Sequence, residues 1–176
     1  MFKVSDPMTT PPPVFSTVLQ QLVYETFSEL EIPFWRVDTD PGLTMEDCQH
    51  IDAKIGVRIV KTLFLCNRQQ TEFYLYVTTD DKPFVTRDFC GALGISRVSF
   101  ASAEKLWKLT GVEVGATTIL SAILPQSAQV HLVMDRAVAE SPWFACTDGT
   151  PTCFVKLRTP DLLDKYLVGR PLQLIG

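Results

Sequence analysis

The chain has 176 residues and a formal net charge of −4, with 46% apolar and 20% charged residues. This size and composition are typical of one globular domain with a core of its own. The charge excludes the strongly basic class of sequence-independent nucleic-acid binders, so any contact with a nucleic acid is expected on one local face.

No signal peptide and no membrane span are predicted. The N-terminal stretch MFKVSDPMTTPPPVF has no basic region followed by an apolar one. No apolar run approaches the roughly 20 residues that cross a bilayer. The five cysteines are scattered without a CxxC pair or a histidine at metal-ligand spacing, which favours free thiols in a reducing cytoplasm. We therefore expect a cytoplasmic protein without a metal site and without membrane association.

The first third of the chain predicts two helices and a strand. Residues 1–13 are expected to form a flexible lead-in, and residues 14–176 a single domain. Helical spacing runs through residues 14–30, with Val14, Val18, Leu22 and Phe27 near one face and Leu19, Val23 and Leu30 close by. Residues 34–38 alternate as a short strand. Thr44 followed by Asp47 resembles a capping box, and the helix it starts at about residue 45 should end at Gly56.

The remaining elements are short and of both kinds. Residues 57–67 and 71–79 are two strands joined by the polar RQQ, which predicts a hairpin. Helices are expected at 86–94, 102–111 and 159–168, the last with Pro160 in its first turn. Further strands are expected at 97–102, 129–135 and 152–157. Since strands and helices mix without strict alternation, the sequence predicts one α+β domain on a mixed sheet.

A lysine interrupts one apolar strand. In RIVKTLFL, residues 58–65, Lys61 stands in the middle of a run built for the interior. A charge in a dry core is costly unless it has a partner. Either the side chain reaches water at a strand edge, or it points into a polar pocket that needs it. The strand by itself leaves both readings open.

The order of KTLFL, YLYV, LGISRVSFASAEKL, GVEVGATT, VHLVMD and DLLDKYL resembles the YbaK/PrdX family of aminoacyl-tRNA editing proteins, over about residues 14–174. These proteins are related to the editing domain inserted in bacterial prolyl-tRNA synthetases. The resemblance implies an α+β fold with a mixed, partly barrel-like β-sheet and flanking helices. It also implies a trans-editing deacylase that hydrolyses the ester of a small mischarged residue such as Ala, Cys, Ser or Thr. The tRNA most often concerned is tRNA(Pro), no cofactor is needed, and prolyl-tRNA synthetase is a candidate partner.

The resemblance further implies which residues form the site. Lys61 would be the catalytic residue, fixing the terminal adenosine or the ester, with no protein nucleophile. The substrate-binding residues would be Thr62, Gly111, Gly115, Thr118 and Thr147. Glycine allows a backbone to approach a ligand closely, yet Gly111 could equally be a helix C-cap, and Thr118 could cap the next element. The pocket volume would depend on which of four side chains face inward: Leu43, Phe64, Ile119 and Leu120.

Several positions depart from the family pattern. Val114 stands where the family usually has Pro, Thr62 where many alanine-specific relatives have Asn, and Thr39 where relatives often have His. In CTDGTPTCF, residues 146–154, Thr147 falls at the position of the family His and Pro151 near that of the family Asn. These departures leave the amino acid and the tRNA open.

Three functional interpretations therefore remain. The first is the trans-editing deacylase, for which it stays open whether Thr147 and Asp148 replace the missing polar contacts or whether the segment is only a turn. The rival to a deacylase is a non-catalytic module that binds tRNA, a synthetase or an amino-acid-like ligand. A third interpretation is hydrolysis of another activated acyl compound.

Two sets of residues are candidates for contacts with a nucleic acid, and the sequence does not decide their role. A few cations suffice for phosphate contacts, and the candidates for an acceptor-stem patch are Arg58, Arg68, Arg97, Lys105 and Lys108. The alternative is an ordinary scatter of solvated charges. Three tryptophans are expected to pack in the core or at its rim rather than to stack on bases: Trp35, Trp107 and Trp143.

Overall fold

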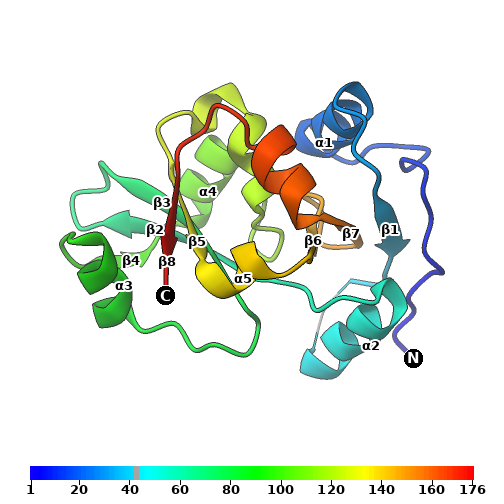
Figure 1. Ribbon diagram of the computed structural model, residues 1–176, viewed down its shortest axis with the longest axis horizontal. Helices are drawn as coiled ribbons and strands as arrows, with labels where there is room; N and C mark the ends of the chain where they lie inside the picture. Colours follow the sequence, from blue (N-terminus) through cyan, green and yellow to red (C-terminus); the bar gives the residue numbers. More distant parts are fainter. Residues whose placement is uncertain (42–43) are drawn as a thin grey trace.

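The computed structural model describes residues 1–41 and 44–176, and it contains two β-sheets that lie side by side (Figure 1). The larger sheet has the strand order β4-β2-β3-β5-β8 and the smaller one the order β1-β7-β6. The strands are β1 Trp35–Asp38, β2 Lys61–Asn67, β3 Phe73–Thr78, β4 Val98–Phe100, β5 His131–Asp135, β6 Trp143–Thr147, β7 Cys153–Arg158 and β8 Leu172–Ile175. The predicted α+β class is confirmed, and the described strands form two open sheets rather than a closed barrel.

The larger sheet is mixed, as predicted. Strand β2 runs antiparallel to β3 and to β4, which confirms the predicted hairpin. Strand β5 runs parallel to both β3 and β8. All pairings in the smaller sheet are antiparallel. The long connection between β3 and β5 carries two α-helices, strand β4, the glycine-containing loop and two 3₁₀-helices.

The helices flank both sheets. They are α1 Val18–Glu29, α2 Met45–Ile55, α3 Thr86–Leu93, α4 Ala103–Thr110 and α5 Arg136–Glu140, with the 3₁₀-helices η1 Ile119–Ile123 and η2 Pro125–Ser127 and the π-helix η3 Asp161–Tyr166. Helix α2 confirms its predicted bounds, because Thr44 and Asp47 form a reciprocal capping box and Gly56 ends the helix with a φ of 79°.

The first helix starts later than predicted and buries only part of the predicted face, with Leu19, Val23 and Phe27 in the core. The side chain of Thr17 accepts the N–H of Gln20, so α1 begins at residue 18 rather than 14. Val14 and Val18, predicted on the buried face, are 79% and 74% exposed. Gln20 and Tyr24 take part in the buried face instead, because both reach a buried carboxylate described below.

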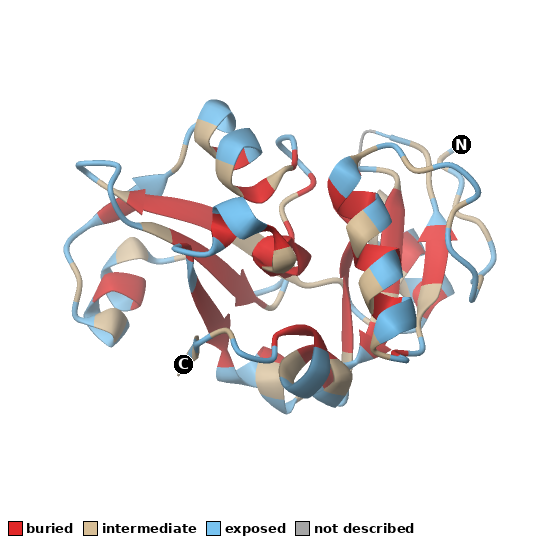
Figure 2. Cartoon of the chain, turned by 90° about the horizontal axis from the view of Figure 1, so that it is seen from above, coloured by how far each residue is buried: buried red, intermediate tan, exposed pale blue. Residues whose placement is uncertain are grey.

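Burial follows the two sheets (Figure 2). Helix α3 covers one face of the larger sheet, with Phe89 packed against Tyr74 and Tyr76. Helix α2 covers the smaller sheet, where Ile51 and Ile55 join the same apolar cluster as a strand valine. The core between them is continuous with α1 and η1. The start of β2 therefore lies where the two sheets and α2 meet.

Among the described elements, α5, β6, β8 and η2 were not foreseen from the sequence. The last predicted helix is a π-helix and covers only residues 161–166 of its range. The expected lead-in, residues 1–13, makes two bridges to the β1 region, Val4 with Thr39 and Met8 with Arg36. The predicted domain boundary stays a prediction. None of the helices in the described ranges has the length and apolar character that crossing a membrane requires.

Candidate active site

A cavity of about 380 Å³ opens where β2 begins, and we call it the Lys61 cavity. Helix α2, the start of β2, the turn after β3, the loop between α4 and η1, and strands β6 and β7 all contribute to its wall. Its lining residues are Cys48, Asp52, Ile59, Val60, Lys61, Thr62, Asp80, Gly115, Thr117, Cys146, Thr147 and Phe154. Four of the six site residues predicted from the sequence lie here: Lys61, Thr62, Gly115 and Thr147.

The backbone explains why these segments meet. Helix α2 ends at Gly56, and residues 57–60 connect it to β2. In this connection, the N–H of Val60 donates to the carbonyl of Ala145 in β6, with an N–O distance of 2.9 Å. This bond joins the entrance of β2 to the smaller sheet. Lys61, the first residue of β2, is consequently placed at the junction of the two sheets.

Lys61 is half-buried, and its ammonium donates a hydrogen bond to the main-chain carbonyl of Lys82. Lys82 in turn forms an ion pair with Asp135, a carboxylate that is almost completely buried. Within the described ranges, no carboxylate lies within 4.0 Å of the Lys61 ammonium. Its position is therefore fixed by a neutral carbonyl, and its positive charge is not neutralised by an acid.

The two predicted threonines of the cavity differ in how their groups are used. Thr62 is half-buried and follows Lys61 along β2. Thr147 is buried, and its hydroxyl donates to the carbonyl of Thr150 and accepts the N–H of Gly149 at 3.2 Å. The Thr147 hydroxyl is therefore occupied within its own turn, even though the residue lines the cavity.

The glycine loop contributes Gly115 and Thr117 to the wall of the same cavity. Gly115 has a φ of 94°, a conformation that favours glycine, while a Cβ there would meet no atom within 4 Å. In the part of the chain that the structure describes, the amides of Gly115 and Thr117 donate to no protein acceptor. Conformation, rather than lack of space, requires this glycine, and the loop carries two amides without a protein acceptor at residues that line the cavity.

Gly111 and Thr118 are not brought into this cavity. Gly111 caps α4 by donating to Trp107, and a Cβ there would lie 2.9 Å from Leu124. The Thr118 hydroxyl accepts the N–H of Leu120 at 3.2 Å and donates to the sulfur of Cys146. Both residues thus occupy the capping roles that the sequence left open. Phe64, Ile119 and Leu120 are buried in the main core, and Leu43 lies outside the described residues.

Sequence reasoning missed the acidic wall of the cavity. Asp52 and Cys48 lie one turn apart on α2, and the i, i+4 spacing of these two polar residues was the available signal. One oxygen of Asp52 accepts the N–H of Ile59 at 3.0 Å. Burial raises the pKa of Asp52, and the nearby Asp80 carboxylate adds to the effect. Asp80 itself forms an ion pair with Arg58 at 2.7 Å.

The two thiols of the cavity are not activated. Burial raises the pKa of Cys48, and the carboxylates of Asp52 and Asp47 raise it further. Burial also raises the pKa of Cys146 to about 12. Only a thiolate is a good nucleophile, so neither cysteine is prepared for nucleophilic attack at neutral pH.

The turn at residues 147–150, which we call the Asp148 turn, is a closed network. Asp148 is fully buried and accepts hydrogen bonds from Gln20 Nε2 at 2.9 Å and from the Tyr24 hydroxyl at 2.6 Å. Its other oxygen accepts the amide and the hydroxyl of Thr150 at 3.1 and 2.7 Å. Asp148 thus faces α1 instead of lining the cavity, in agreement with the interpretation of this segment as a turn.

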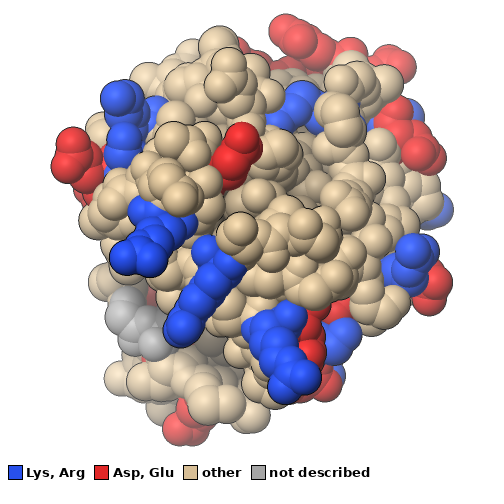
Figure 3. Space-filling model, turned by 90° about the vertical axis from the view of Figure 1, so that its left-hand side faces the viewer, with Lys and Arg blue, Asp and Glu red and all other residues tan. Residues whose placement is uncertain are grey.

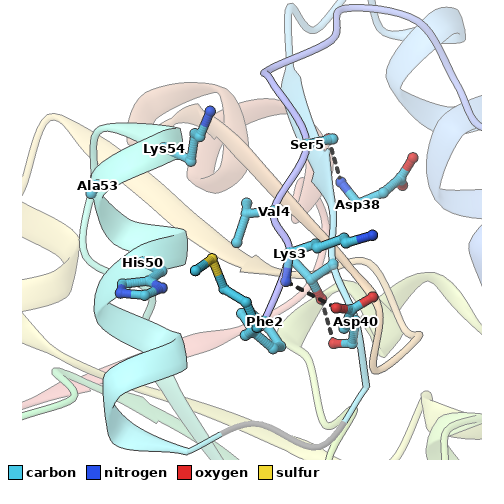
Figure 4. A pocket seen from close by; sticks show the side chains of 11 residues that line it. Phe2, Lys3, Val4, Ser5, Asp38, Asp40, His50, Ala53 and Lys54 are labelled. Atoms are coloured by element: carbon cyan, nitrogen blue, oxygen red, sulfur yellow. Dashed lines mark hydrogen bonds between the residues drawn. The ribbon is translucent and has the colours of Figure 1, made fainter.

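A second, larger cavity of about 900 Å³ lies between α2 and the N-terminal segment (Figure 4). Its wall includes Phe2, Val4 and His50. The polar groups around it bind one another: the Lys3 amide donates to Asp40 at 2.9 Å, as Figure 4 shows. None of the six site residues predicted from the sequence lines this cavity.

The predicted cationic patch is dispersed. Arg58 is paired with Asp80 and with Asp81. The other four candidates are Arg68 in the β2–β3 turn, Arg97 before β4, and Lys105 and Lys108 on α4. Figure 3 shows the left-hand side of the molecule in Figure 1. Basic side chains are spread over this side, several with acidic ones nearby, rather than gathered in one patch. A contact between this side and tRNA stays a prediction.

Two of the three tryptophans pack against each other. The rings of Trp35 and Trp143 meet edge-on with centroids 5.5 Å apart, and the Lys156 ammonium lies over both at 5.2 and 5.0 Å. Trp107, on α4, is 55% exposed. The rim packing predicted for these residues fits the first two.

Three comparisons with known proteins bear on this site. A family model described as the aminoacyl-tRNA editing domain matches residues 39–165, a range that includes every lining residue of the Lys61 cavity. The prolyl-tRNA editing protein ProX of Acetoanaerobium sticklandii is 29% identical over 117 residues, which cover 66% of this chain and 71% of ProX.

Solved structures share the fold at low sequence identity. A candidate trans-editing enzyme for prolyl-tRNA synthetase aligns with a TM-score of 0.64 and 16% identity, covering 90% of this chain and 96% of that one. The hypothetical protein APE2540 aligns with a TM-score of 0.66 and 21% identity, covering 86% of this chain and 96% of that one. At these identities the likeness concerns the fold.

Proposed function

This chain belongs to the aminoacyl-tRNA editing domain family, and from that premise we propose that it is a trans-editing deacylase. It would hydrolyse the ester between a small mischarged amino acid and its tRNA, with tRNA(Pro) as the first candidate, since the similar ProX is named a prolyl-tRNA editing protein. The observation that carries the proposal is the meeting of Lys61, Thr62, Gly115 and Thr147 from three segments at one cavity.

The reaction needs little covalent chemistry from the protein. An aminoacyl ester is already activated: the oxygen of a water bonds to the carbonyl carbon, the carbonyl–ribose C–O bond breaks, and the ribose oxygen takes up a proton. The site has to hold the ester and water in place and stabilise the negative charge that develops on the carbonyl oxygen. The absence of an activated thiol among the described lining residues is compatible with direct attack by water.

Different lining residues are suited to each of these tasks. The Lys61 ammonium carries a positive charge with no acidic partner among the described residues, so it is available to a carbonyl oxygen or a phosphate. The free amides of Gly115 and Thr117 are suited to a developing oxyanion. The volume of about 380 Å³ lies near the lower end of typical ligand sites, which favours a small aminoacyl group.

The test is deacylation of a panel of mischarged tRNAs that includes Ala-tRNA(Pro), Cys-tRNA(Pro) and Ser- and Thr-charged species. Lys61→Ala should abolish the hydrolysis of the preferred species. Lys54→Ala is the matched control, because Lys54 lies on the other side of α2, beside the larger cavity, and pairs with Asp6 at 2.8 Å. Equal activity in wild type and Lys61→Ala would contradict the proposed site.

A non-catalytic module is the alternative outcome of the same test. It is favoured by one observation: Thr147 stands at the position of the family His, and its hydroxyl is occupied within the turn. If the wild type cleaves no species above background but binds tRNA or a synthetase, the binding function replaces the catalytic one.

A further inference from the structure

We propose that Asp52 forms a subsite for the free α-ammonium group of the aminoacyl ester, an inference that rests on the proposed function. An uncleaved aminoacyl-tRNA carries this ammonium group close to the scissile carbonyl. An N-acylated ester, such as a peptidyl or formylated one, lacks the charge. A carboxylate in the same cavity as Lys61 would therefore let the site distinguish the two classes of ester.

Asp52 lies in the wall of the same cavity as Lys61. Asp52 comes from α2 and Lys61 from β2, and both line the same cavity of about 380 Å³. The two opposite charges are not paired with each other, because no ion pair joins them within 4.0 Å. The cavity consequently offers a positive group to the carbonyl or phosphate end of a substrate and a negative group to its amino end.

Only one oxygen of the Asp52 carboxylate is hydrogen-bonded in the described part of the chain. Its Oδ1 accepts the amide of Ile59 at 3.0 Å, which fixes the side chain. Within the described residues, its Oδ2 has no hydrogen-bond donor and no cation within salt-bridge distance. A partly buried carboxylate without an ion-pair partner in contact is unfavourable. An ammonium group in the cavity would supply the missing partner.

The neighbouring acid is less suited to this role. Asp80 lines the cavity as well, but its carboxylate is paired with Arg58 at 2.7 Å. Arg58 also reaches Asp81 at 3.6 Å, so the arginine is shared between two acids outside α2. Of the two cavity carboxylates, Asp52 is the one that forms no ion pair within 4.0 Å in the described part of the chain, and Arg58 attracts it only from a greater distance.

The proposal predicts a charge-dependent preference in binding. A charge-assisted hydrogen bond to an ammonium group should favour the free amine over its N-acetyl form by about 10- to 100-fold. Asn at position 52 keeps an oxygen for the Ile59 amide and removes only the charge, so the fold should be retained. The preference, rather than overall affinity, is the quantity that a merely structural role of Asp52 would not change.

The experiment uses two non-hydrolysable probes, 3′-deoxy-3′-(L-alanylamino)adenosine and its N-acetyl derivative. Calorimetric titration of the full chain gives the affinity ratio of the two probes for wild type and for Asp52→Asn. Asp81→Asn is the matched control, because it removes the same charge from an exposed residue outside the cavity. We expect the ratio to fall to about one in Asp52→Asn and to be unchanged in Asp81→Asn.

The outcomes separate this subsite from the proposed function. A ratio that is equal in wild type and Asp52→Asn overturns the subsite, as does a wild type that binds neither probe or does not prefer the amine. Loss of the preference in Asp52→Asn supports the subsite even if no mischarged tRNA is cleaved, a result that would contradict only the deacylase.

Discussion

Asp148, in the Asp148 turn, and Asp52, at the Lys61 cavity, are both carboxylates shielded from bulk water, but they differ in the number of hydrogen bonds that they accept. Asp148 accepts four hydrogen bonds, from α1 and from its own turn, so its bonding is complete within the fold. Asp52 accepts one described hydrogen bond and borders a cavity. A buried polar group with all its partners serves the fold, whereas one with a free oxygen at a cavity is available to a ligand.

The largest effect is expected on the stability of the closed network. Asp148→Ala leaves buried donors of Gln20, Tyr24 and Thr150 without their acceptor. Each such group costs about 1–3 kcal/mol, so the free energy of unfolding should fall by at least about 3 kcal/mol. Urea denaturation measures it, with Asp164→Ala, an exposed carboxylate, as the control. A loss no greater than that of the control would show that the network does not stabilise the fold.

The next effect is on activity and should be confined to the open site. Lys61→Met removes the charge but keeps most of the side-chain volume. We expect kcat/KM for deacylation to fall by about 100-fold or more, since electrostatic groups in such sites contribute on that scale. The free energy of unfolding should change by less than about 0.5 kcal/mol. Unfolding of the variant, rather than inactivity, would reverse the assignment of this region.

A single donor of the closed network should have a smaller effect. Tyr24→Phe removes the hydroxyl that donates to Asp148 and lies 3.4 Å from the Cys153 sulfur. The loss of one hydrogen bond to a carboxylate should destabilise the protein by about 1.5 kcal/mol. Deacylation per folded molecule should stay at the wild-type rate. A fall in that rate would mean that the Asp148 turn also positions Thr147 for catalysis.

The smallest effect has the opposite sign. Burial raises the pKa of Asp52, so the folded state binds its proton more tightly than the unfolded state does. Ionisation of Asp52 therefore reduces stability as the pH rises through that raised pKa. We expect Asp52→Asn to be more stable than wild type at neutral pH, by less than about 1 kcal/mol because the carboxyl is partly solvated. Urea titrations should show no gain below the ordinary aspartate pKa of about 3.9. A gain that is independent of pH would contradict this cause.

Helix ends and short-range turns were predictable from the sequence, because the residues that determine them are local. Thr44, Asp47 and Gly56 set both ends of α2, and the RQQ turn between β2 and β3 was confirmed. The face of α1 was not predictable in this way. Its apolar spacing included Phe27, which is buried, and Val18, which is exposed. The partner of Gln20 and Tyr24 is Asp148, more than a hundred residues later in the chain.

The sequence by itself determined the fold class, the family resemblance and Lys61 as the residue to examine, because each depends on residue order along the chain. Only the tertiary structure decided that Thr62, Gly115 and Thr147 join Lys61 at one cavity while Gly111 and Thr118 cap helices. It also introduced Asp52. The wall of a cavity is formed by segments that are distant in sequence. Whether a polar group there is left without a hydrogen-bond partner depends on neighbours that only the folded chain brings close.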